Sequence, residues 1–593
     1  MKTISRNKDF ENTGLYNYSD IFCREETARN LLNHAARNKL EISQYWNNMR
    51  RYYDGEHDIR KETNSLYEKH SLPWRASQST DGYIHVESLI EPEIPDFEFS
   101  PRSESQTDKA KQREAITRYI LDTNDMLFKN SRNERRLGIY GSAVWKVCWD
   151  DNSDFSGDKG DVCIDAPDPS QIYPDPSASD IDSCEYIGYV YKMHKQRAAR
   201  VFKRDFELRG TCLEDYLRTS AHSEYSGTEN DAYDETDTVS ITEWWFRQPK
   251  DGSMSIKSVY NGKERHMKYT WESGDIGLCI FINGKEIKYI PKYWRNTKCR
   301  MLPFVIYNKI PSEKSIWGKS ELEQIIPLID AVDREMAYAQ LNSAFSSNDI
   351  ILLEENALSD DSNPDNSPGA VWKLRPGMTG KVQRLGNLSS SSAPIQNACS
   401  FWRSLEEATT GNFEANQGKE PTSVTTATGI ALLGERAQNR KTLKNIDRNS
   451  GFKRLFRLCD MTALEFYGDG RVLRIQGENS SEKTVYKYSS FCEKNREESY
   501  IPYVDVIIHT GKGIGSSPAF TLSALNTLMT MGINKDNYGI VKAYLDEINI
   551  PQRAELKAYI DSKFEKEPDT KEDTEEIDKL FDTLQIGKEN EQI

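Results

Sequence analysis

The stretch that decides the fold is residues 318–345, GKSELEQIIPLIDAVDREMAYAQLNSAF, which has the pattern of an amphipathic helix. Ser320 and Glu323 form an S-x-x-E capping box, a signal for the start of a helix, just ahead of an apolar run. The apolar residues of that run recur every three or four positions and line one helix face: Leu322, Ile325, Ile326, Ile329, Val332 and Met336. Pro327 lies within the run, so we expect a kink or a break near the first two turns.

Two more helices follow in the same part of the chain. Residues 394–410 predict a second helix, and residues 424–467 predict a third, much longer one. An insert rich in turn signals, residues 346–392, separates the first helix from the second, and a polar loop, residues 412–423, joins the second to the third. Two helices that leave and return around an insert form an extended object, which is poor geometry for a compact enzyme core.

The flanking regions combine helices and strands, so the fold class is α+β with several domains. On the amino-terminal side we expect helices, strands and Asn-Gly hairpin turns: helices over 25–53 and 106–128 and from Lys195, strands over 143–149 and 186–193, and a mainly β region over 239–307 with turns at Asn261-Gly262 and Asn283-Gly284. After Gly468 we expect further strands, then short helices over 518–532, 534–547 and 552–564. Residues 565–593 are strongly acidic and predict a solvated or disordered tail.

Composition excludes several classes of protein. A chain of 593 residues is too long for one core, so several domains are expected. No apolar run approaches the ~20 residues that span a bilayer, and the amino terminus has no apolar signal core, so we expect neither membrane insertion nor secretion by that route. The ten cysteines include no C-x-x-C pair, which argues against a zinc site or a disulfide framework and suits a reducing compartment. The net charge of −15 argues against tight gripping of DNA but leaves open a surface past which DNA slides.

Catalytic and metal motifs find little support. The sequence EKSIWGKS, residues 313–320, has the Gly-Lys-Ser of a phosphate-binding loop, but Glu313 stands where that loop needs its first glycine. The eight histidines show no metal-ligand spacing, and G-x-S-x-G is absent. Five aspartates cluster among prolines, where calcium is conceivable, but turn and capping roles account for them better: Asp165, Asp168, Asp175, Asp180 and Asp182. We therefore predict no catalytic residue, no cofactor and no metal.

One charged feature stands out on the third predicted helix. Its basic residues face only Glu435 and Asp447: Arg436, Arg440, Lys441, Lys444 and Arg448, followed by Lys453, Arg454 and Arg457. The band is either a solvated helix face with ion pairs between subunits, or a surface that contacts phosphates or a partner. Under the second interpretation, neutralising Arg440, Lys441 and Lys444 impairs DNA passage or assembly.

Taken in order, the segments resemble the portal proteins (head-to-tail connectors) of tailed double-stranded DNA bacteriophages. YWNNMRRYYDGEH is similar to that family's aromatic helix with its Tyr-x-Gly end, and GIYGSAVWKVCWDD to its Gly-rich turn and strand. DAPDPSQIYPDPSASDIDSCEYIG resembles the Asp-Pro segment before a tyrosine strand. LPFVIYNKIPSEKSIWGKSELEQIIPLIDAVDREMAYAQLN resembles the Pro-Phe strand, the Gly-x-Ser turn and the stem helix. No single motif is diagnostic; the order carries the resemblance, which spans roughly residues 25–530.

The resemblance implies a mainly helical portal fold with wing, stem, clip and crown, assembled as a ring that is usually a dodecamer. It divides the chain as follows: 1–315 as the amino-terminal α+β wing, 316–345 and 393–411 as stem helices, 346–392 as the clip, 412–423 as the tunnel loop, 424–510 as the long helix and the rest of the wing, 511–564 as a helical crown, and 565–593 as the acidic tail.

By the same resemblance, two sets of residues have functional positions. The tunnel loop holds Asn412, Phe413, Glu414, Asn416, Gln417, Lys419 and Glu420, and the clip that faces terminase and adaptors holds Asp349, Glu354, Glu355, Trp372 and Arg375. The implied partners are other copies of the chain, the terminase large subunit, head-completion or tail-adaptor proteins, major capsid and scaffolding proteins, and double-stranded DNA in transit. The implied location is the portal vertex of the virion, after assembly in the cytoplasm of the bacterial host.

Two alternatives remain open. A packaging ATPase or nuclease has only WGKS in its favour, and ATP turnover by the isolated protein would support it. A head-assembly protein without a channel predicts that no closed ring forms.

Overall fold

The computed structural model describes most of the first two-thirds of the chain and parts of the remainder: residues 18–56, 80–102, 106–155, 158–202, 238–260, 263–347, 350–354, 357–359, 373–385, 393–410, 427–469, 471–476, 481–485, 491, 493–495 and 498–509. The chain divides into two compact units, one of residues 1–417 and 444–508 and the other of residues 418–443 and 509–593. In the second unit, the described residues are His509 and the beginning of one long helix. The predicted short helices after residue 518 and the acidic tail lie outside the described residues.

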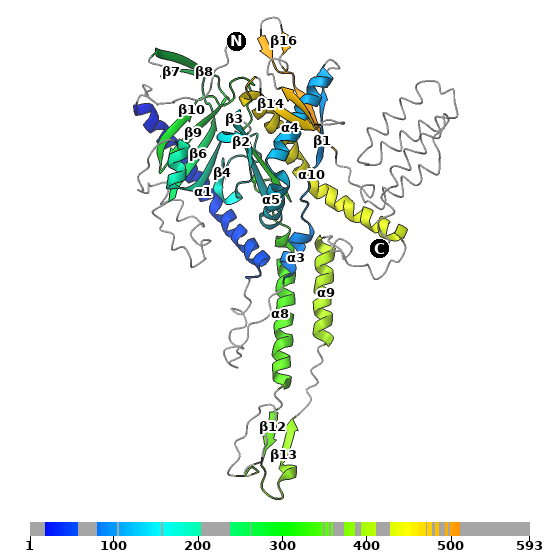
Figure 1. The fold of residues 1–593 in the computed structure, drawn as a ribbon. Coiled ribbons are helices and arrows are strands. Elements are labelled where there is room, and N and C mark those ends of the chain that lie inside the picture. The colour runs from blue at the N-terminus through cyan, green and yellow to red at the C-terminus, as the bar shows by residue number, and fades with distance from the viewer. Residues whose placement is uncertain are drawn as a thin grey trace, which may run out of the picture. The chain divides into compact units, whose positions relative to one another are not determined.

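The predicted helices that the structure describes occur in the predicted order, together with α3, which was not predicted (Figure 1). They are α1 (Tyr18–Asp54), α3 (Asp81–Ser88), α4 (Thr107–Thr123), α5 (Met126–Tyr140), α6 (Lys195–Phe202), α8 (Leu322–Ser347), α9 (Ala393–Thr410) and α10 (Ala427–Phe466), with the short 3-10 turns η2 (Pro169–Gln171) and η5 (Thr379–Lys381). The helix predicted over 106–128 is two helices, because Asp125 adopts a left-handed backbone with φ 50° and separates α4 from α5. The run NERRLGIY, which lies between the helix predicted over 106–128 and the strand predicted over 143–149, is the end of α5.

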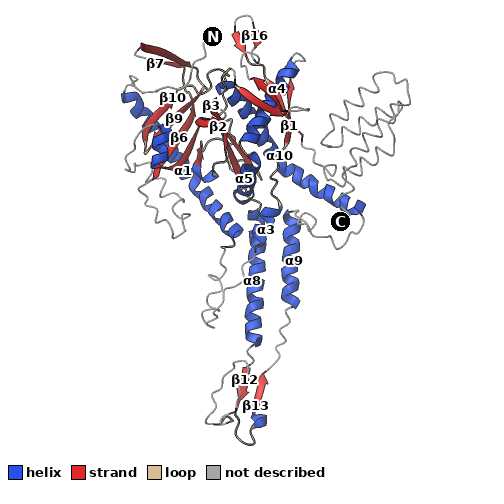
Figure 2. Cartoon of the chain, in the orientation of Figure 1, coloured by secondary structure: helices blue, strands red, loops and turns tan. Residues whose placement is uncertain are grey.

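The strands form several antiparallel sheets, shown as red arrows in Figure 2. They are β1 (Asp96–Pro101), β2 (Ser142–Phe155), β3 (Asp158–Asp165), β4 (Ile172–Pro174), β5 (Tyr186–His194), β6 (Thr238–Arg247), β7 (Gly252–Tyr260), β8 (Lys263–Trp271), β9 (Ile276–Ile282), β10 (Lys285–Ile290), β11 (Phe304–Asn308), β12 (Ile350–Leu353), β13 (Val382–Leu385), β14 (Val472–Gln476), β15 (Ser481–Val485), β16 (Glu493–Asn495), β17 (Glu498–Tyr500) and β18 (Val504–His509). The strands predicted after Gly468 are confirmed as β14, β15 and β18.

A five-stranded sheet in the order β10-β9-β6-β5-β4 occupies one side of the first unit. Its central strand β6 is buried along almost its whole length, which explains the nearly continuous apolar run VSITEWWF. The amino-terminal helix α1 covers one face, where Ala28 and Leu32 pack with Trp244 and Phe281. The predicted Asn283-Gly284 turn joins β9 to β10, and both of its residues have positive φ, as a two-residue hairpin requires.

The main core lies between this sheet, the three-stranded sheet β11-β2-β3 and the second half of α10. Phe452 and Phe456 of α10 are fully buried, and the Phe456 ring stacks on Phe97 with centroids 4.1 Å apart. Gly451 lets the helix approach Tyr307, because a Cβ at this position would lie 2.8 Å from the Tyr307 Cβ. The apolar run around GFKRLFRLCD is therefore the helix face that closes the core.

Buried polar groups fix α10 to α4 and to the loop between β10 and β11. Arg113 of α4 forms a two-contact ion pair with Asp460, and both side chains are buried. Glu465 accepts hydrogen bonds from three consecutive backbone N–H groups, those of residues 295–297, at distances from 2.8 to 3.1 Å. These contacts hold both carboxylates, which would otherwise be costly to bury.

Three aspartates of the Asp-Pro segment have the predicted turn and capping roles: Asp168, Asp175 and Asp180. The Asp180 carboxylate accepts the N–H groups of Asp182 and Ser183 at 2.9 and 2.8 Å, and Asp168 caps η2 by accepting the N–H of Ser170 at 2.9 Å. Within the described ranges, no group of carboxylates, histidines or cysteines is arranged to hold a metal.

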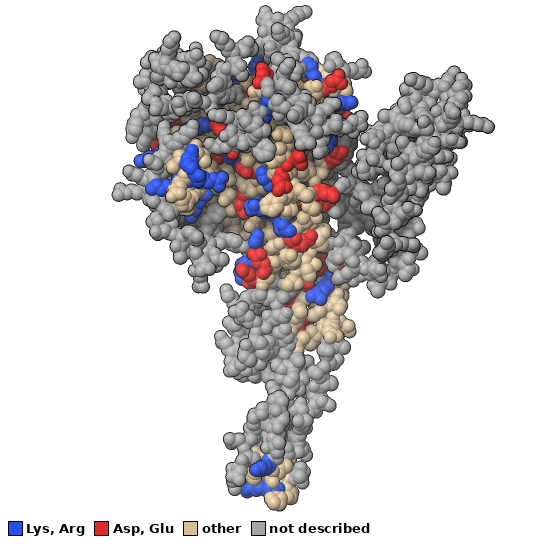
Figure 3. All heavy atoms as spheres, viewed as in Figure 1, with Lys and Arg blue, Asp and Glu red and all other residues tan. Residues whose placement is uncertain are grey.

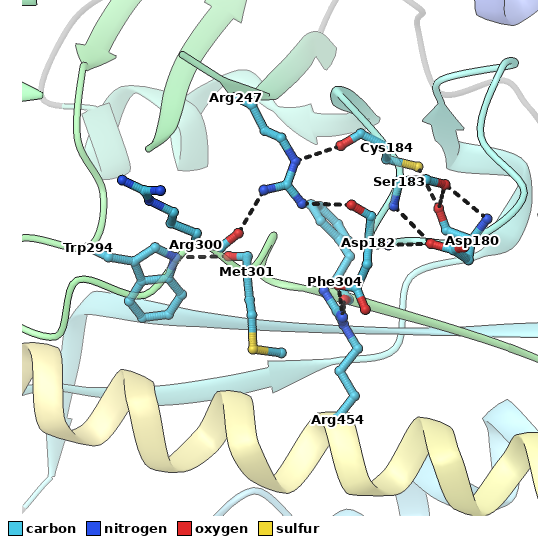
Figure 4. A network of polar contacts seen from close by, with 10 residues as sticks. All are labelled: Asp180, Asp182, Ser183, Cys184, Arg247, Trp294, Arg300, Met301, Phe304 and Arg454. Carbon is cyan, nitrogen blue, oxygen red and sulfur yellow. Dashed lines mark hydrogen bonds and ion pairs between the residues drawn. The ribbon is translucent and has the colours of Figure 1, made fainter. Parts of the chain in front are cut away.

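Two arginines bind this segment to the rest of the first unit (Figure 4). Arg247 donates to the backbone oxygens of Asp182, Cys184 and Arg300, at 3.1, 3.0 and 2.9 Å. Arg454 of α10 donates to the Phe304 carbonyl at 3.1 Å and pairs with the Asp182 carboxylate.

The helices α8 and α9 flank the insert in the chain, as predicted. Figure 1 shows the two helices side by side, and they pack against each other. The sequence predicts a kink or a break at Pro327, and the break does not occur, because α8 runs through Pro327 as one helix. The insert was predicted as turns, but it contains an antiparallel hairpin in which β12 pairs with β13, from Ile350 opposite Leu385 to Leu353 opposite Val382.

Candidate functional site: the anchored helix pair

The turn before α8 fixes that helix to the sheets. The Gly318 N–H donates to Ser142 Oγ at 2.8 Å and to Asn308 Oδ1 at 3.0 Å. Gly141 permits this contact, because it has φ 78° and a Cβ there would lie 2.2 Å from the Lys319 carbonyl carbon. The two glycines let three backbone segments meet without side chains between them.

The same turn contains the Gly-Lys-Ser sequence that resembles part of a phosphate-binding loop. A phosphate-binding loop offers successive backbone N–H groups to its ligand. Here the Gly318 N–H is used as described, the Lys319 N–H donates to the Ile310 carbonyl at 2.9 Å, and the Ser320 N–H donates to Tyr45 Oη at 2.9 Å. All three donors are occupied by the protein itself, so this turn is a structural junction and the phosphate-loop interpretation loses its geometric basis.

A tyrosine completes the helix cap of α8. Ser320 Oγ accepts the Leu322 N–H at 3.1 Å, which is the capping role predicted for it. Glu323 does not bond directly to Ser320, because the Tyr45 hydroxyl lies between them. The Tyr45 hydroxyl accepts from the Ser320 N–H and donates to Glu323 Oε2 at 3.3 Å. Burial raises the pKa of Tyr45, so the hydroxyl keeps the proton that it donates.

The first half of α8 is buried in an apolar cluster with α1, α3 and α5. The cluster contains Met49, Val86, Ile139, Leu322, Ile325 and Ile329. At its edge the Tyr52 hydroxyl donates to Asp330 Oδ1 at 2.8 Å. The predicted apolar face of the helix is thus confirmed for Leu322, Ile325 and Ile329, and it anchors α8 at its amino-terminal end.

Lys39 is a residue whose role the sequence did not reveal. Its ammonium group is buried and donates to the carbonyls of Pro169 at 2.7 Å and Ser170 at 2.8 Å, and also to that of Ile172. It also lies over the ring of Trp317, 5.3 Å from the centroid. One lysine therefore ties α1 to the Asp-Pro segment and to the turn before α8. The sequence carries no signal for this, because an isolated lysine on a helix is ordinarily solvated.

The second helix, α9, returns to the same anchor. Its Arg403 bonds to Asp81 at the start of α3 through two contacts, at 3.3 and 3.4 Å. One turn further on, Glu406 is buried, and burial together with the charge of Asp81 raises its pKa to about 7. The carboxyl end of α9 therefore lies beside α3, as the amino-terminal half of α8 does, so the two helices are antiparallel.

Part of the helix pair presents apolar side chains to solvent. Phe401 is 61% exposed, Leu405 39% and Tyr338 49%. The apolar residues Ile395, Cys399 and Trp402 of α9 are half-buried, whereas Leu405 is exposed. Phe401 and Leu405 are four residues apart and so share one helix face.

Of the clip residues, the structure describes two. Glu354 follows β12, is exposed and pairs with Lys381 at 2.8 Å. Arg375 is half-buried, and its N–H donates to the Ala357 carbonyl at 3.1 Å. Asp349, Glu355 and Trp372 lie outside the described residues. The tunnel-loop residues also lie outside them: Asn412, Phe413, Glu414, Asn416, Gln417, Lys419 and Glu420.

The basic band of α10 does not behave as one surface. Arg448 is buried and pairs with Glu134 at 2.7 Å, so for this residue the prediction of a DNA- or partner-facing side chain is wrong. The physical reason is that Arg448 lies beside the aromatic run that closes the core, where its charge needs an acidic partner. Lys453 is exposed, and Arg454 and Arg457 are half-buried. For four other members the structure describes the helix backbone and not the side chains: Arg436, Arg440, Lys441 and Lys444.

Among the helices that the structure describes, none combines the length and apolar character needed to cross a bilayer. None of the curated proteins compared with the chain matches it. A family model described as "Phage P22-like portal protein" matches residues 86–580, which is most of the chain and includes the helix pair α8 and α9. That family is structural and non-enzymatic. The chain therefore belongs to the family of phage P22-like portal proteins.

Proposed function

We propose that copies of this chain close into a ring of about twelve subunits at one capsid vertex. Double-stranded DNA passes through the ring when the terminase motor packages it and again when it is ejected. Membership in the portal family supports the role, and the anchored helix pair supports the route.

The observation that carries the proposal is the antiparallel pair α8 and α9. At one end, α8 is fixed to β2 and β11 because the Gly318 N–H donates to Ser142 and Asn308, and α9 is fixed to α3 through the Arg403–Asp81 contact. The insert of residues 346–392 connects their other ends. The exposed Phe401 and Leu405 on α9 are apolar side chains that a neighbouring subunit would cover.

The other parts take their roles from this arrangement. Residues 316–345 and 393–411 form the stem, and residues 346–392 form the clip that docks terminase and the adaptor proteins. Residues 412–423 form the tunnel loop, and residues 511–564 the crown. Residues 1–315 and 424–510 form the wing, which faces the capsid and scaffolding proteins.

The charge of the chain suits a conduit. Each phosphate neutralised by the wall strengthens binding through counterion release and would slow translocation. A subunit with net charge −15 avoids that effect. The energy for packaging comes from a separate ATPase, because the Gly-Lys-Ser turn uses its own backbone donors to hold α8.

Complementation of a phage that lacks its portal gene tests this function. The wild-type chain is expected to restore nuclease-protected DNA inside capsids. A variant in which a Gly-Ser linker replaces residues 350–385 is expected to form rings but protect no DNA, since the docking surface is gone. Glu272→Gln, which removes an exposed ion pair with Arg300 outside the insert, serves as the control and should package normally. Normal DNA protection by the linker variant would overturn the docking role of the hairpin.

A further inference from the structure

The helix α6 carries a cationic surface that none of the roles above uses. Residues 186–202 contain no acidic residue, although the whole chain is acidic. The basic side chains of this segment are Lys192 at the end of β5 and Lys195, Arg197 and Arg200 on α6. We call these four residues the α6 patch. Figure 3 shows Lys and Arg side chains grouped over the place that α6 occupies in Figure 1.

The apolar side of α6 explains why the cations point outward. Ala198 is fully buried, and Phe202 packs against the main core. Arg197 and Arg200 are three residues apart on the opposite side, and both are exposed. The helix position is thus set by packing, and the patch is a fixed array.

Local electrostatics oppose this array. Arg197 and Arg200 are neighbours of like charge on one helix, which is unfavourable. Lys195 lies in the first turn, where the helix dipole disfavours a cation, and that turn contains no acid. Elsewhere on the same unit, exposed arginines have partners, as Arg300 has Glu272 and Arg118 has Asp96. Within the described part of the chain, no ion pair involves the α6 patch.

We propose that the α6 patch binds the phosphate backbone of double-stranded DNA, at a place separate from the helix pair. The patch belongs to the five-stranded sheet, since α6 follows β5 directly and contacts β5 and β6. An eight-residue helix is about 12 Å long, which matches about three phosphates of one strand at 3.4 Å each along the axis. Arginine suits the contact because its guanidinium binds phosphate oxygens in pairs.

DNA is favoured over a second copy of the chain on grounds of charge and chemistry. The patch has no apolar centre of the kind that stable protein interfaces have. The inference rests on the proposed function in one respect only, namely that such a protein meets packaged DNA. Because the contact is electrostatic, it would be independent of sequence and sensitive to salt.

Fluorescence anisotropy with the full-length protein and a labelled duplex of about 20 base pairs, measured over a series of salt concentrations, tests the proposal. Arg197→Glu with Arg200→Glu is expected to weaken binding at least about tenfold at low salt and to reduce the salt slope by about 2. Arg197→Gln with Arg200→Gln keeps good helix formers and should reduce the slope similarly. Lys111→Glu with Lys250→Glu is the matched control, because both lysines are exposed and the change in net charge is the same as in the first variant.

If the control pair weakened DNA binding as much as the patch variant does, the effect would be due to net charge alone, and the proposal would be overturned. Unchanged DNA binding by both patch variants would overturn it as well, and if those variants then failed to enter capsids, the partner would be a protein. Native mass spectrometry on the same samples reports ring formation independently. Rings that form while the patch variants bind DNA normally would refute this inference and leave the proposed function standing.

Discussion

Arg448 gives the sharpest test of how α10 is held. Its Nε donates to Glu134 Oε1 at 2.7 Å, and its Nη2 donates to the carbonyls of Glu91 and Glu93 at 3.1 and 3.0 Å. Arg448 and Glu134 are 4% and 5% exposed, so water replaces neither partner. The change Arg448→Met keeps the stem of the side chain and removes the charge.

Removing one partner of a buried ion pair costs about 3–5 kcal/mol, because the other charge is left uncompensated. Both residues lie in the compact unit of residues 1–417 and 444–508, so at about 2.1 cal/mol/K of unfolding entropy per residue this corresponds to a fall in Tm of roughly 3–5 °C. Burial already raises the pKa of Glu134, and the loss of Arg448 raises it further. A carboxyl whose folded pKa lies above its unfolded pKa loses stability as pH rises through the folded value. The Arg448→Met deficit is therefore smallest in acid and largest near neutrality.

The assay is thermal denaturation of the full chain at pH 5 and pH 8. Lys453→Met is the control, since Lys453 is exposed on the same helix and its replacement should change the stability by less than about 0.5 kcal/mol. The double variant Glu134→Leu with Arg448→Met should recover most of the loss, because both charges leave together. Equal Tm values for Arg448→Met and Lys453→Met, or a deficit that does not depend on pH, would refute the reasoning.

Three further predictions address the helix pair, its anchor and the basic band. Glu406→Gln should raise Tm at pH 8 and leave Tm unchanged at pH 5. The reason is that the pKa of Glu406 is about 7, so its buried side chain is charged only at the higher pH. Equal effects on Tm at both pH values would contradict this prediction. Gly141→Ala should abolish soluble protein in an expression assay, since the new Cβ would collide with the turn before α8. The control Gly380→Ala, whose Cβ meets nothing within 4 Å, should express normally. Soluble Gly141→Ala protein would contradict the prediction and show that the junction can adapt. Replacing Arg440, Lys441 and Lys444 of α10 by Gln should lower DNA packaging or the yield of rings. Unlike Arg448→Met, this triple change should not lower Tm. Normal packaging together with normal oligomers would refute the prediction.

The sequence predicts those elements whose pattern is long and regular. The start of α8 follows from the capping box at Ser320, and its buried face follows from the apolar spacing at Leu322, Ile325 and Ile329. The Asn283-Gly284 hairpin follows from the backbone angles that this dipeptide favours. In each case local chemistry and the tertiary fold agree.

The failures arise where long-range contacts decide. A charge count along α10 cannot distinguish a solvated arginine from Arg448, whose partner Glu134 lies more than 300 positions away in the chain. The cap at Ser320 needs Tyr45 from α1, and the break expected at Pro327 does not occur in the unbroken α8. The hairpin β12–β13 was missed because its strands are four residues each and are separated by turn-rich sequence.

Single-particle cryo-electron microscopy of the purified full chain tests the central claim most directly. The account predicts closed rings with an axial opening, a copy number near twelve, and α8 and α9 around the opening with Phe401 and Leu405 covered by the neighbouring subunit. A protein that stays monomeric and hydrolyses ATP would contradict it, as would a closed assembly in which α8 and α9 of each copy face away from the axis.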